Sequence, residues 1–551
     1  MHINYFKKLI LTKKHFIYLI LSGILLSLAW TTWGMAWTLF VALVPLFYIE
    51  DKISTSIPKN NRIIFSYAYI VFFVWNLITT WWVSNSTLGG GIAAVVLNSL
   101  FYTILFTFFH RIKKKVKNNS IYFLFLVFWL AWEYFYINGE ISWIWLVLGN
   151  GFANNTSWIQ WYEYTGTLGG SLWVLLVNVL VYLSIKKAAK HFFKNAYFFI
   201  ALGIFILPII FSEYLKYTYQ EEKNPISFAI VQPNIDPYTE KFSAMPSDKQ
   251  LEKMLSLIRE KAAKNVDFFV LPETAIEDNI VENDFTLSKD IRTVQEFMLQ
   301  YPNTSLITGA TTIYIYPKNK KSETARKYSN GYYYDYFNTA LQINKRDSLQ
   351  KYHKSKLVIG VEMMPYPSFF RLFENFIISL GGTSGTLGTQ KERSVFRNSQ
   401  NKACVAPAVC YESIYGEFMT EFIQKGANVI FVITNDAWWG DTPGYKQHFS
   451  YSKLRAIENR RSIVRCANTG ISAIINQKGE VEKHTEYWKE DVLNGSVNLN
   501  EKLTFYSQNG DYIGRIALFI SYFWLLGFML HTIYKIINTL RIKPKRKATK
   551  S

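Results

Sequence analysis

Cysteine is scarce in this sequence, and its scarcity excludes a fold held together by disulfides. The 551 residues include only Cys404, Cys410 and Cys466. An odd, sparse set does not build a disulfide framework, and a single strand would hold Cys404 and Cys410 too far apart to bridge. We therefore expect Cys404 and Cys466 to be small buried hydrophobic residues, whereas Cys410 needs a separate explanation.

Signals for a metal or for a nucleotide phosphate are also missing. The eight histidines form no HxxxH or HxH pair, so we expect no metal centre and no cofactor. Among them, His448 is expected to be a structural hydrogen-bonding residue. The glycine-rich stretches at 88–91 and 381–385 lack the strand, lysine and helix of a phosphate-binding loop.

The formal net charge of +20 first suggests a nucleic-acid partner, but the positions of the basic residues argue against one. Lysines and arginines cluster beside apolar segments, at 7–14, 52–62, 111–117, 186–194 and 541–550. Short basic loops next to apolar spans are typical of the cytoplasmic side of a membrane protein. No basic stripe follows a plausible recognition element, and a basic tail beside a span suits anionic lipid headgroups. We therefore expect membrane lipid, and no nucleic acid, as a partner.

Long apolar runs divide the chain into membrane and soluble parts. A span needs about 20 mostly apolar residues, and eight segments qualify: 16–33, 35–49, 63–83, 91–110, 120–136, 168–185, 196–215 and 512–537. These spans predict a membrane domain of seven transmembrane helices at 1–215, a soluble domain at 216–511, and an eighth helix with a basic tail at 512–551. Residues 1–33 are not interpreted as a cleaved signal peptide, because no small-residue cleavage site follows them.

The charges of the loops predict the orientation of the chain. The loops at 84–90 and 137–167 contain no lysine or arginine, whereas the loops that alternate with them are basic. This alternation predicts a cytoplasmic N-terminus. Seven crossings then carry 216–511 to the side of the membrane opposite the cytoplasm, and the eighth returns the tail to the cytoplasm. Glu133 lies inside an apolar run, where both a pairing with a neighbouring helix and a role near substrate are open.

Residues 226–500 alternate strand-like and helix-like segments. Apolar, β-rich runs predict strands at 226–231, 267–271, 305–309, 338–343, 405–410, 429–434 and 471–476. Amphipathic patterns predict helices at 247–264, at 415–425 and at 444–463. Such alternation indicates a layered α/β domain, and roughly 290 residues suffice for one large core or for a sandwich of two sheets.

Three segments carry side chains that could take part in catalysis: Glu273, Lys354 and Cys410. Glu273 and Cys410 lie where predicted strands end, and a rigid scaffold presents catalytic groups at such positions. A thiol at a strand-to-helix turn gains acidity from helix N-terminal amides and from a nearby ammonium group, as a nucleophile requires. Taken singly, each has an ordinary alternative, namely a solvated carboxylate, a surface lysine and a buried cysteine.

Taken together, in the order Glu, Lys, Cys, the three segments resemble the nitrilase superfamily, which has an α-β-β-α sandwich and a Glu-Lys-Cys triad for acyl chemistry on carbon–nitrogen bonds. The resemblance continues through the segments at 434–440, 447–448, 455–460 and 465–470. Seven spans before such a domain and one after it resemble the apolipoprotein N-acyltransferase family of Gram-negative inner membranes, as do the segments at 161–166, 231–235, 504–506 and 510–511. The implied fold is an α-helical polytopic membrane domain plus an α/β nitrilase-like α-β-β-α sandwich domain.

The resemblance also implies residue roles. Cys410 is implied as the nucleophile, Glu273 as the general base, and Lys354 as the group that stabilises the oxyanion. The supporting or substrate-binding residues that it implies are Glu362, Tyr411 and Glu412. Two positions depart from the family pattern: Ile359-Gly360-Val361 stands where Pro-Phe-Gly usually precedes the glutamate, and Phe242 stands where many members have Trp.

The implied reaction moves a fatty acyl chain from a phospholipid donor, through a thioester on Cys410, to the N-terminal amine of a diacylglyceryl-modified lipoprotein. Two other interpretations use the same features: a membrane-anchored nitrilase-like amidase or hydrolase that passes the acyl group to water, and a non-enzymatic scaffold. Because water has to be kept from a thioester, we expect apolar lid loops within 360–385, where aromatic and aliphatic residues recur at helical spacing. An ordinary buried helix is the alternative there.

Overall fold

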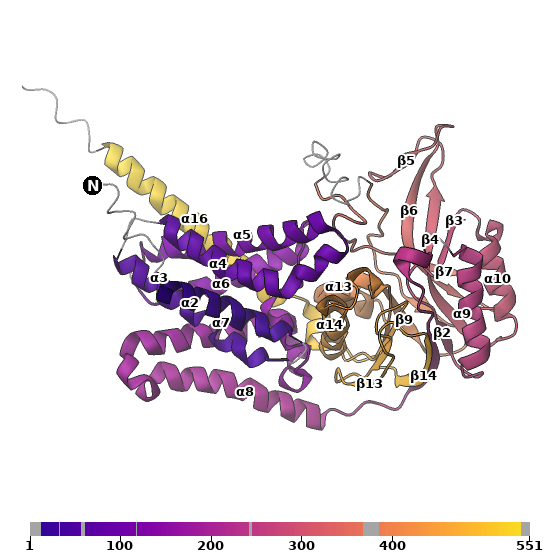
Figure 1. Cartoon of the computed structure of the whole chain (residues 1–551), viewed down its shortest axis with the longest axis horizontal. Coiled ribbons are helices and arrows are strands. Elements are labelled where there is room, and N and C mark those ends of the chain that lie inside the picture. Colours follow the sequence, from indigo (N-terminus) through magenta and orange to yellow (C-terminus); the bar gives the residue numbers. More distant parts are fainter. Residues whose placement is uncertain are drawn as a thin grey trace, which may run out of the picture.

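A bundle of long helices and an α/β domain lie side by side in the computed structural model (Figure 1). The structure describes residues 13–31, 34–56, 61–116, 118–241, 245–366 and 385–541. The chain forms most of the bundle first, then the α/β domain, and finally returns along the bundle as α16 (Tyr512–Arg541), which packs on α6 (Ile121–Asn138).

Within the described residues, seven helices are long and apolar enough to cross a membrane. Besides α6 and α16, they are α2 (Lys13–Ser27, continued by η1, Leu28–Trp30), α4 (Asn61–Thr80), α5 (Leu88–Lys113), α7 (Tyr162–Ala188) and α8 (Ala196–Thr218). The chain is therefore a multi-pass membrane protein.

The segment predicted as the second span is not one continuous helix. It forms a 3₁₀ helix, η2 (Ala36–Val41), followed by α3 (Val44–Ser56). Pro45 has no backbone N–H to donate, so a regular helix cannot run through this point. The segment still crosses the bundle, because Trp30 just before it bonds to Tyr451 of the α/β domain, whereas Asp51 pairs with Lys186 at the opposite end.

The loops predicted to be cytoplasmic meet at one end of the bundle. There Lys113 at the end of α5 pairs with Glu50 and Asp51 of α3, and Lys186 of α7 pairs with Asp51 at 2.8 Å. The lysine-free loops meet the α/β domain at the other end. Buried Glu133 of α6 serves the fold at this end, since its Oε1 accepts hydrogen bonds from Trp129 Nε1 at 2.9 Å and from the Leu148 backbone at 3.1 Å.

The α/β domain contains two sheets. The first has the order β14-β1-β2-β4-β6-β5, with β3 also paired to β4 and β7 to β6. Its strands are β1 (Pro225–Gln232), β2 (Phe268–Val270), β3 (Ile276–Val281), β4 (Ser305–Ile315), β5 (Arg326–Lys327), β6 (Tyr333–Ile343), β7 (Gln350–His353) and β14 (Asp491–Asn498). The second has the order β13-β12-β11-β10-β9-β8. Its strands are β8 (Phe396–Arg397), β9 (Cys404–Val409), β10 (Val429–Thr434), β11 (Ile463–Ala467), β12 (Ala473–Ile475) and β13 (Val481–His484).

The two sheets pack face to face and a helical layer covers each of them. Phe228 and Phe268 of the first sheet contact the ring of Phe431 in the second, with centroids 6.3 and 5.2 Å apart. The helices α9 (Ser247–Lys261) and α10 (Lys289–Met298) cover the first sheet, and α13 (Gly416–Gln424) and α14 (Pro443–Asn459) lie between the second sheet and the bundle (Figure 1). The predicted α-β-β-α sandwich beside a helical membrane part is confirmed.

Candidate active site

Three chain segments that follow strands bring Glu273, Lys354 and Cys410 into one site. Glu273 follows β2 and Lys354 follows β7, both in the first sheet, whereas Cys410 follows β9 in the second. All three side chains are buried, and Cys410 is 7% exposed. The site therefore lies where the two sheets of the sandwich meet.

Glu273 is held by donors from three different elements. Its Oε1 accepts from Lys354 Nζ at 3.0 Å and from Asn338 Nδ2 at 2.8 Å, and its Oε2 accepts from the Asn435 backbone at 3.1 Å. The turn packs tightly on β4, where a Cβ on Gly309 would lie 2.7 Å from Glu273 Cα. These bonds stabilise the negative charge of the carboxylate and fix its direction.

Lys241 also supports this turn, although the sequence did not predict a role for it. Lys241 is buried, and its Nζ donates to the backbone oxygens of Thr274 at 2.9 Å and Glu273 at 3.3 Å. Thr274 has a φ of 47°, an uncommon conformation for a β-branched residue. Burial lowers the pKa of Lys241, although Glu277 and Glu273 oppose this shift. Lys241 was not predictable from its surroundings, which resemble a solvated charged segment.

Lys354 lies between two carboxylates. Its Nζ is 3.0 Å from Glu273 Oε1 and 2.8 Å from Glu362 Oε1. Burial alone would lower the pKa of Lys354, but the charges of Glu273 and Glu362 outweigh burial and raise the pKa well above its ordinary value. Lys354 is therefore a fixed ammonium group. Glu362 reaches it despite the atypical preceding segment, in which Gly360 has a φ of 81°.

The Cys410 thiol is not acidified in the way expected from the sequence. Burial raises the pKa of Cys410 above its ordinary value, and the Glu273 carboxylate raises it further, so the lowering effect of Lys354 is outweighed. The 3₁₀ helix that follows, η10 (Cys410–Ile414), is also too short to supply a helix dipole. The raised pKa indicates that Cys410 rests as a thiol, which has to lose its proton in order to react.

Tyr411 and Glu412, next to Cys410, face different surroundings. The Tyr411 ring packs on Trp145, from the loop at 137–167 of the membrane part, with ring centroids 6.0 Å apart. Glu412 is fully buried, and its carboxylate accepts from the Ser355 backbone at 2.5 Å and from the Val409 backbone at 2.9 Å. Tyr411 thus faces the membrane part, whereas Glu412 joins two segments of the site and has no open side toward a substrate.

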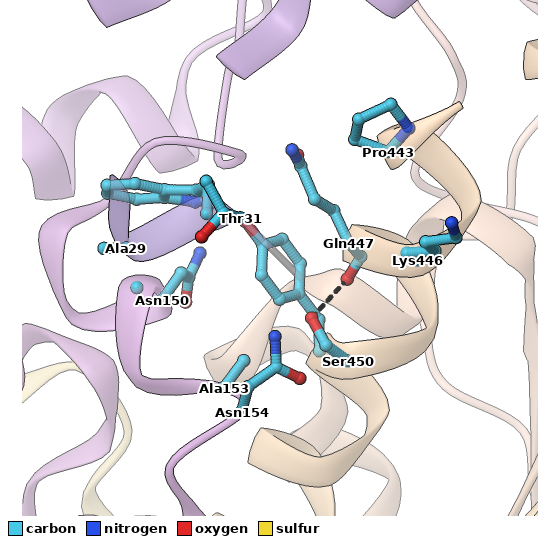
Figure 2. Close-up of a pocket in the computed structure, with 12 residues that line it drawn as sticks. Ala29, Thr31, Asn150, Ala153, Asn154, Pro443, Lys446, Gln447 and Ser450 are labelled. Atoms are coloured by element: carbon cyan, nitrogen blue, oxygen red, sulfur yellow. Dashed lines mark hydrogen bonds between the residues drawn. The ribbon is translucent and has the colours of Figure 1, made fainter. Parts of the chain in front are cut away.

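Aromatic side chains join the membrane part to the turn that carries Cys410. Trp82, in the 3₁₀ helix η3 (Trp81–Asn85) that follows α4, contacts Trp145 and Trp439, each with ring centroids 5.0 Å apart. Asn85 Nδ2 also donates to the Trp439 carbonyl at 2.9 Å. Nearby, a small cavity of about 20 Å³ lies between η1, the loop at 150–154 and α14 (Figure 2).

Comparison with known proteins assigns both halves of this architecture. A model of the carbon-nitrogen hydrolase family matches residues 227–502, which is half of the chain. The chain belongs to this family. A model described as the apolipoprotein N-acyltransferase N-terminal domain matches residues 22–180. The membrane part and the α/β domain thus identify the chain as an acyltransferase of the apolipoprotein N-acyltransferase family.

Curated relatives match the enzyme along almost its full length. The apolipoprotein N-acyltransferase of Chlorobaculum tepidum is 29% identical over 528 residues, which cover 93% of this chain and 96% of the relative. The apolipoprotein N-acyltransferase of Geobacter metallireducens is 25% identical and covers 91% of this chain, with 92% of its own length matched. The apolipoprotein N-acyltransferase of Rickettsia bellii is 28% identical, and the match covers 83% of this chain and 84% of the relative.

Some sequence-based predictions lie outside the described residues. The predicted lid at 360–385 is one of these predictions, because the structure does not describe residues 367–384. The prediction for Phe242 is another, since Phe242 is also not described. Cys404 and Cys466 are buried in β9 and β11, as predicted.

Proposed function

We propose that the enzyme transfers a fatty acyl chain from a phospholipid to the N-terminal amine of a diacylglyceryl-modified lipoprotein, with Cys410 as the acyl carrier. The observation that carries the assignment of residues is the ion pair between Lys354 and Glu273, at 3.0 Å, beside the Cys410 thiol. A base, a cation and a thiol at one site are the groups that covalent acyl transfer requires.

The first half-reaction forms the thioester. Glu273 accepts the proton of Cys410 as the sulfur attacks the ester carbonyl of the phospholipid, and Lys354 stabilises the negative oxygen that develops. Removal of one hydrogen-bond donor from an oxyanion site costs about 3–4 kcal/mol of transition-state stabilisation, and we expect a contribution of this order from Lys354. The ester C–O bond then breaks, Glu273 returns the proton to the departing glycerol oxygen, and lysophospholipid leaves.

The second half-reaction forms the amide. The acceptor amine attacks the thioester carbonyl, Glu273 takes a proton from the amine nitrogen, and the C–S bond breaks. The proton then passes to sulfur, which restores the thiol. Because the first product leaves before the acceptor reacts, ping-pong kinetics are expected. Lys354 stabilises the negative oxygen in both half-reactions. Its raised pKa keeps it an ammonium group, as this role requires.

The contacts between the two parts support amphiphilic substrates. Tyr411 packs on Trp145 next to the nucleophile, and Trp145 and Trp82 lie where membrane helices end. Tryptophan is enriched at the headgroup level of bilayers. We therefore assign the nucleophile to the outer surface of the inner membrane, where the ester of a phospholipid reaches the thiol without leaving the bilayer.

A transfer assay tests the proposed function. The full-length protein in nanodiscs receives a phospholipid with a labelled acyl chain and a synthetic diacylglyceryl-cysteine lipopeptide, and labelled amide is measured. We expect amide from the wild type and from Cys404→Ala, and none from Cys410→Ala. Cys404 is a matched control because it is also buried and lies on the preceding strand. Release of labelled fatty acid without amide, or amide formation by Cys410→Ala, would overturn the proposal.

The orientation has a separate test. Leu287 is a well-exposed residue of the α/β domain, so a cysteine placed there reports which side of the membrane the domain occupies. We expect Leu287→Cys to react with a membrane-impermeant thiol reagent in cells whose outer membrane has been permeabilised and whose inner membrane is intact. Labelling only after the inner membrane is lysed would place the domain in the cytoplasm and overturn this assignment.

A further inference from the structure

A second group of buried polar side chains surrounds the nucleophile, and the mechanism above does not use it. Cys410 Sγ, a carboxylate oxygen of Asp436 and a ring nitrogen of His448 all lie within 4.8 Å of one another. Asp436 follows β10, and His448 belongs to α14. Both side chains are fully buried, so their polar atoms have to be satisfied within the protein.

The hydrogen bonds give the imidazole ring one orientation. His448 Nδ1 lies 2.8 Å from Asp436 Oδ1. A carboxylate only accepts hydrogen bonds, so Nδ1 carries the hydrogen that faces it. Arg465 Nη2 donates to the other oxygen of Asp436 at 2.6 Å, and Thr434 Oγ1 donates to Oδ1 at 2.8 Å. Asp436 is thereby fixed, and it fixes the ring.

The opposite ring nitrogen faces the nucleophile turn. His448 Nε2 lies 3.2 Å from the Cys410 carbonyl oxygen and 3.2 Å from Ser413 Oγ. Because Nδ1 carries the hydrogen, Nε2 of the neutral ring is an acceptor, and the donor that faces it is the Ser413 hydroxyl, which also lies 2.7 Å from the Cys410 carbonyl oxygen. The ring nitrogen thus fixes the Ser413 side chain across the turn that begins with the nucleophile.

This turn needs support because its backbone is strained. Cys410 has a φ of 51°, in the left-handed region that is unfavourable for a non-glycine residue. The conformation sets the direction of the Cα–Cβ bond and therefore of the thiol. Rotation of the ring is blocked as well, since the Trp439 and Trp145 rings pack against it at 5.6 and 6.1 Å.

We infer that His448, oriented by Asp436, is a positioning residue for the nucleophile: its Nε2 accepts from the Ser413 hydroxyl and so holds the Cys410–Ser413 turn in the left-handed conformation that directs the thiol toward Glu273 and Lys354. The inference rests on the proposed role of Cys410. It extends that role to a residue on α14, a helix that also contacts the membrane part.

Charge argues against two other roles for the cluster. A cysteine, a histidine and an aspartate are ligand types that zinc accepts, but the Arg465 guanidinium already lies 2.6 Å from the carboxylate and would oppose a second cation. His448 is also a poor substitute for Glu273 as the base. Burial and then Arg465 lower the pKa of His448, although Asp436 and the Cys410 carbonyl oppose the shift.

A pair of amide variants separates the two sides of the ring. In His448→Asn, the amide reaches about as far as Nδ1, so the contact with Asp436 is kept and the contact with the Cys410 turn is lost. In His448→Gln, the amide reaches about as far as Nε2, so the contact with the turn is kept. Both variants are measured as full-length protein in nanodiscs.

Two readouts are taken for each variant. The first is kcat and KM for acyl transfer. The second is the rate at which iodoacetamide alkylates Cys410, followed on the Cys410 peptide by mass spectrometry. Alkylation needs no lipid or acceptor, so it tests the position of the thiol even if the proposed acyl transfer fails in the wild type.

We expect His448→Asn to lower kcat and alkylation roughly tenfold, about the effect of one lost buried hydrogen bond, with KM unchanged within about twofold. His448→Gln is expected to stay within about threefold of the wild type, and both variants should melt at similar temperatures. Equal losses in the two variants would assign His448 to packing, and wild-type rates in His448→Asn would remove it from the site; either result overturns the inference.

If His448→Asn does not fold, Ser413→Ala, which removes only a hydroxyl from the same turn, takes its place and should show the same roughly tenfold loss. Wild-type kcat and alkylation rates in Ser413→Ala would also overturn the inference.

Discussion

Glu412 Oε1 accepts a hydrogen bond from the Ser355 backbone N–H at 2.5 Å, and its other oxygen accepts from the Val409 backbone at 2.9 Å. One carboxylate therefore connects the residue after Lys354 with the residue before Cys410. The two sheets supply these segments separately, so this bridge sets the distance between the cation and the nucleophile. Burial raises the pKa of Glu412, although the backbone donors oppose the shift.

Substitution of Glu412 should separate activity from folding. Glu412→Gln keeps one oxygen but turns an amide N–H₂ toward a backbone donor, so at least one buried N–H loses its partner. We expect a loss of about 1–3 kcal/mol in stability and a fall in kcat larger than the change in KM. Thermal unfolding and the transfer assay measure both. Wild-type kcat in Glu412→Gln would show that the bridge does not position the site.

Glu273→Gln should change thiol reactivity and acyl transfer in opposite directions. The Glu273 charge raises the pKa of Cys410, so its removal lowers that pKa and speeds alkylation by iodoacetamide at a fixed alkaline pH. The same change removes the general base, so acyl transfer should fall by about 10²–10⁴-fold. Parallel loss of both activities would contradict the assignment of Glu273 as a base and point to a structural role.

The pH dependence of alkylation tests the state of the resting nucleophile. Because the pKa of Cys410 lies above the ordinary value of a thiol, the thiolate fraction at neutral pH is small. We expect the alkylation rate of the wild type to keep rising above pH 9 without a plateau. A plateau below pH 8 would mean that the thiolate is already formed in the resting enzyme.

The pKa of His448 predicts a loss of stability in acid. Burial and Arg465 hold the pKa of His448 below its ordinary value of 6.5. As the pH falls below 6.5, the unfolded chain binds this proton before the folded chain does, so folding stability decreases. The melting temperature of the wild type should fall between pH 7 and pH 5, and that of His448→Gln should fall less. Identical slopes would exclude His448 as a source of the acid sensitivity.

The contact between the membrane part and the site also has a testable consequence. Trp82 is buried between Trp145 and Trp439. Trp82→Ala should cost about 3–5 kcal/mol and loosen the nucleophile turn, and therefore lower kcat. Trp37 is 53% exposed, so Trp37→Ala is a control that should leave the melting temperature and kcat nearly unchanged. Similar effects of the two substitutions would contradict a specific role for the Trp82 contact.

Much of the fold followed from local pattern. The apolar runs at 226–231 and 429–434 and the amphipathic face of 247–264 predicted β1, β10 and α9, because strand and helix periods differ. The predicted helix at 444–463 ended early: Arg460 has a φ of 48°, which terminates α14, and the next apolar residues form β11. A composite span such as 36–56 was predictable in position but not in shape, since hydropathy does not report where a proline interrupts a helix.

The site could be predicted only where residues lie near strand ends or match a family motif. Glu273 and Cys410 met both conditions, and Lys354 met the second. Lys241 met neither. Asp436 met both, but its contact with His448 is set by how distant segments pack. The acidity of Cys410 was also beyond local reasoning. The sequence placed an ammonium group near the thiol, but only the structure shows that burial and Glu273 outweigh it.

Intact-protein mass spectrometry after incubation with phospholipid alone tests most directly whether Cys410 carries the acyl chain. The account predicts a mass increase of one acyl group on the wild type and on Cys404→Ala. This increase should be removed by hydroxylamine, lost on addition of the lipopeptide acceptor, and absent from Cys410→Ala. An acyl adduct that persists in Cys410→Ala, or amide formation with no adduct on the wild type under any condition of donor excess, would contradict the account.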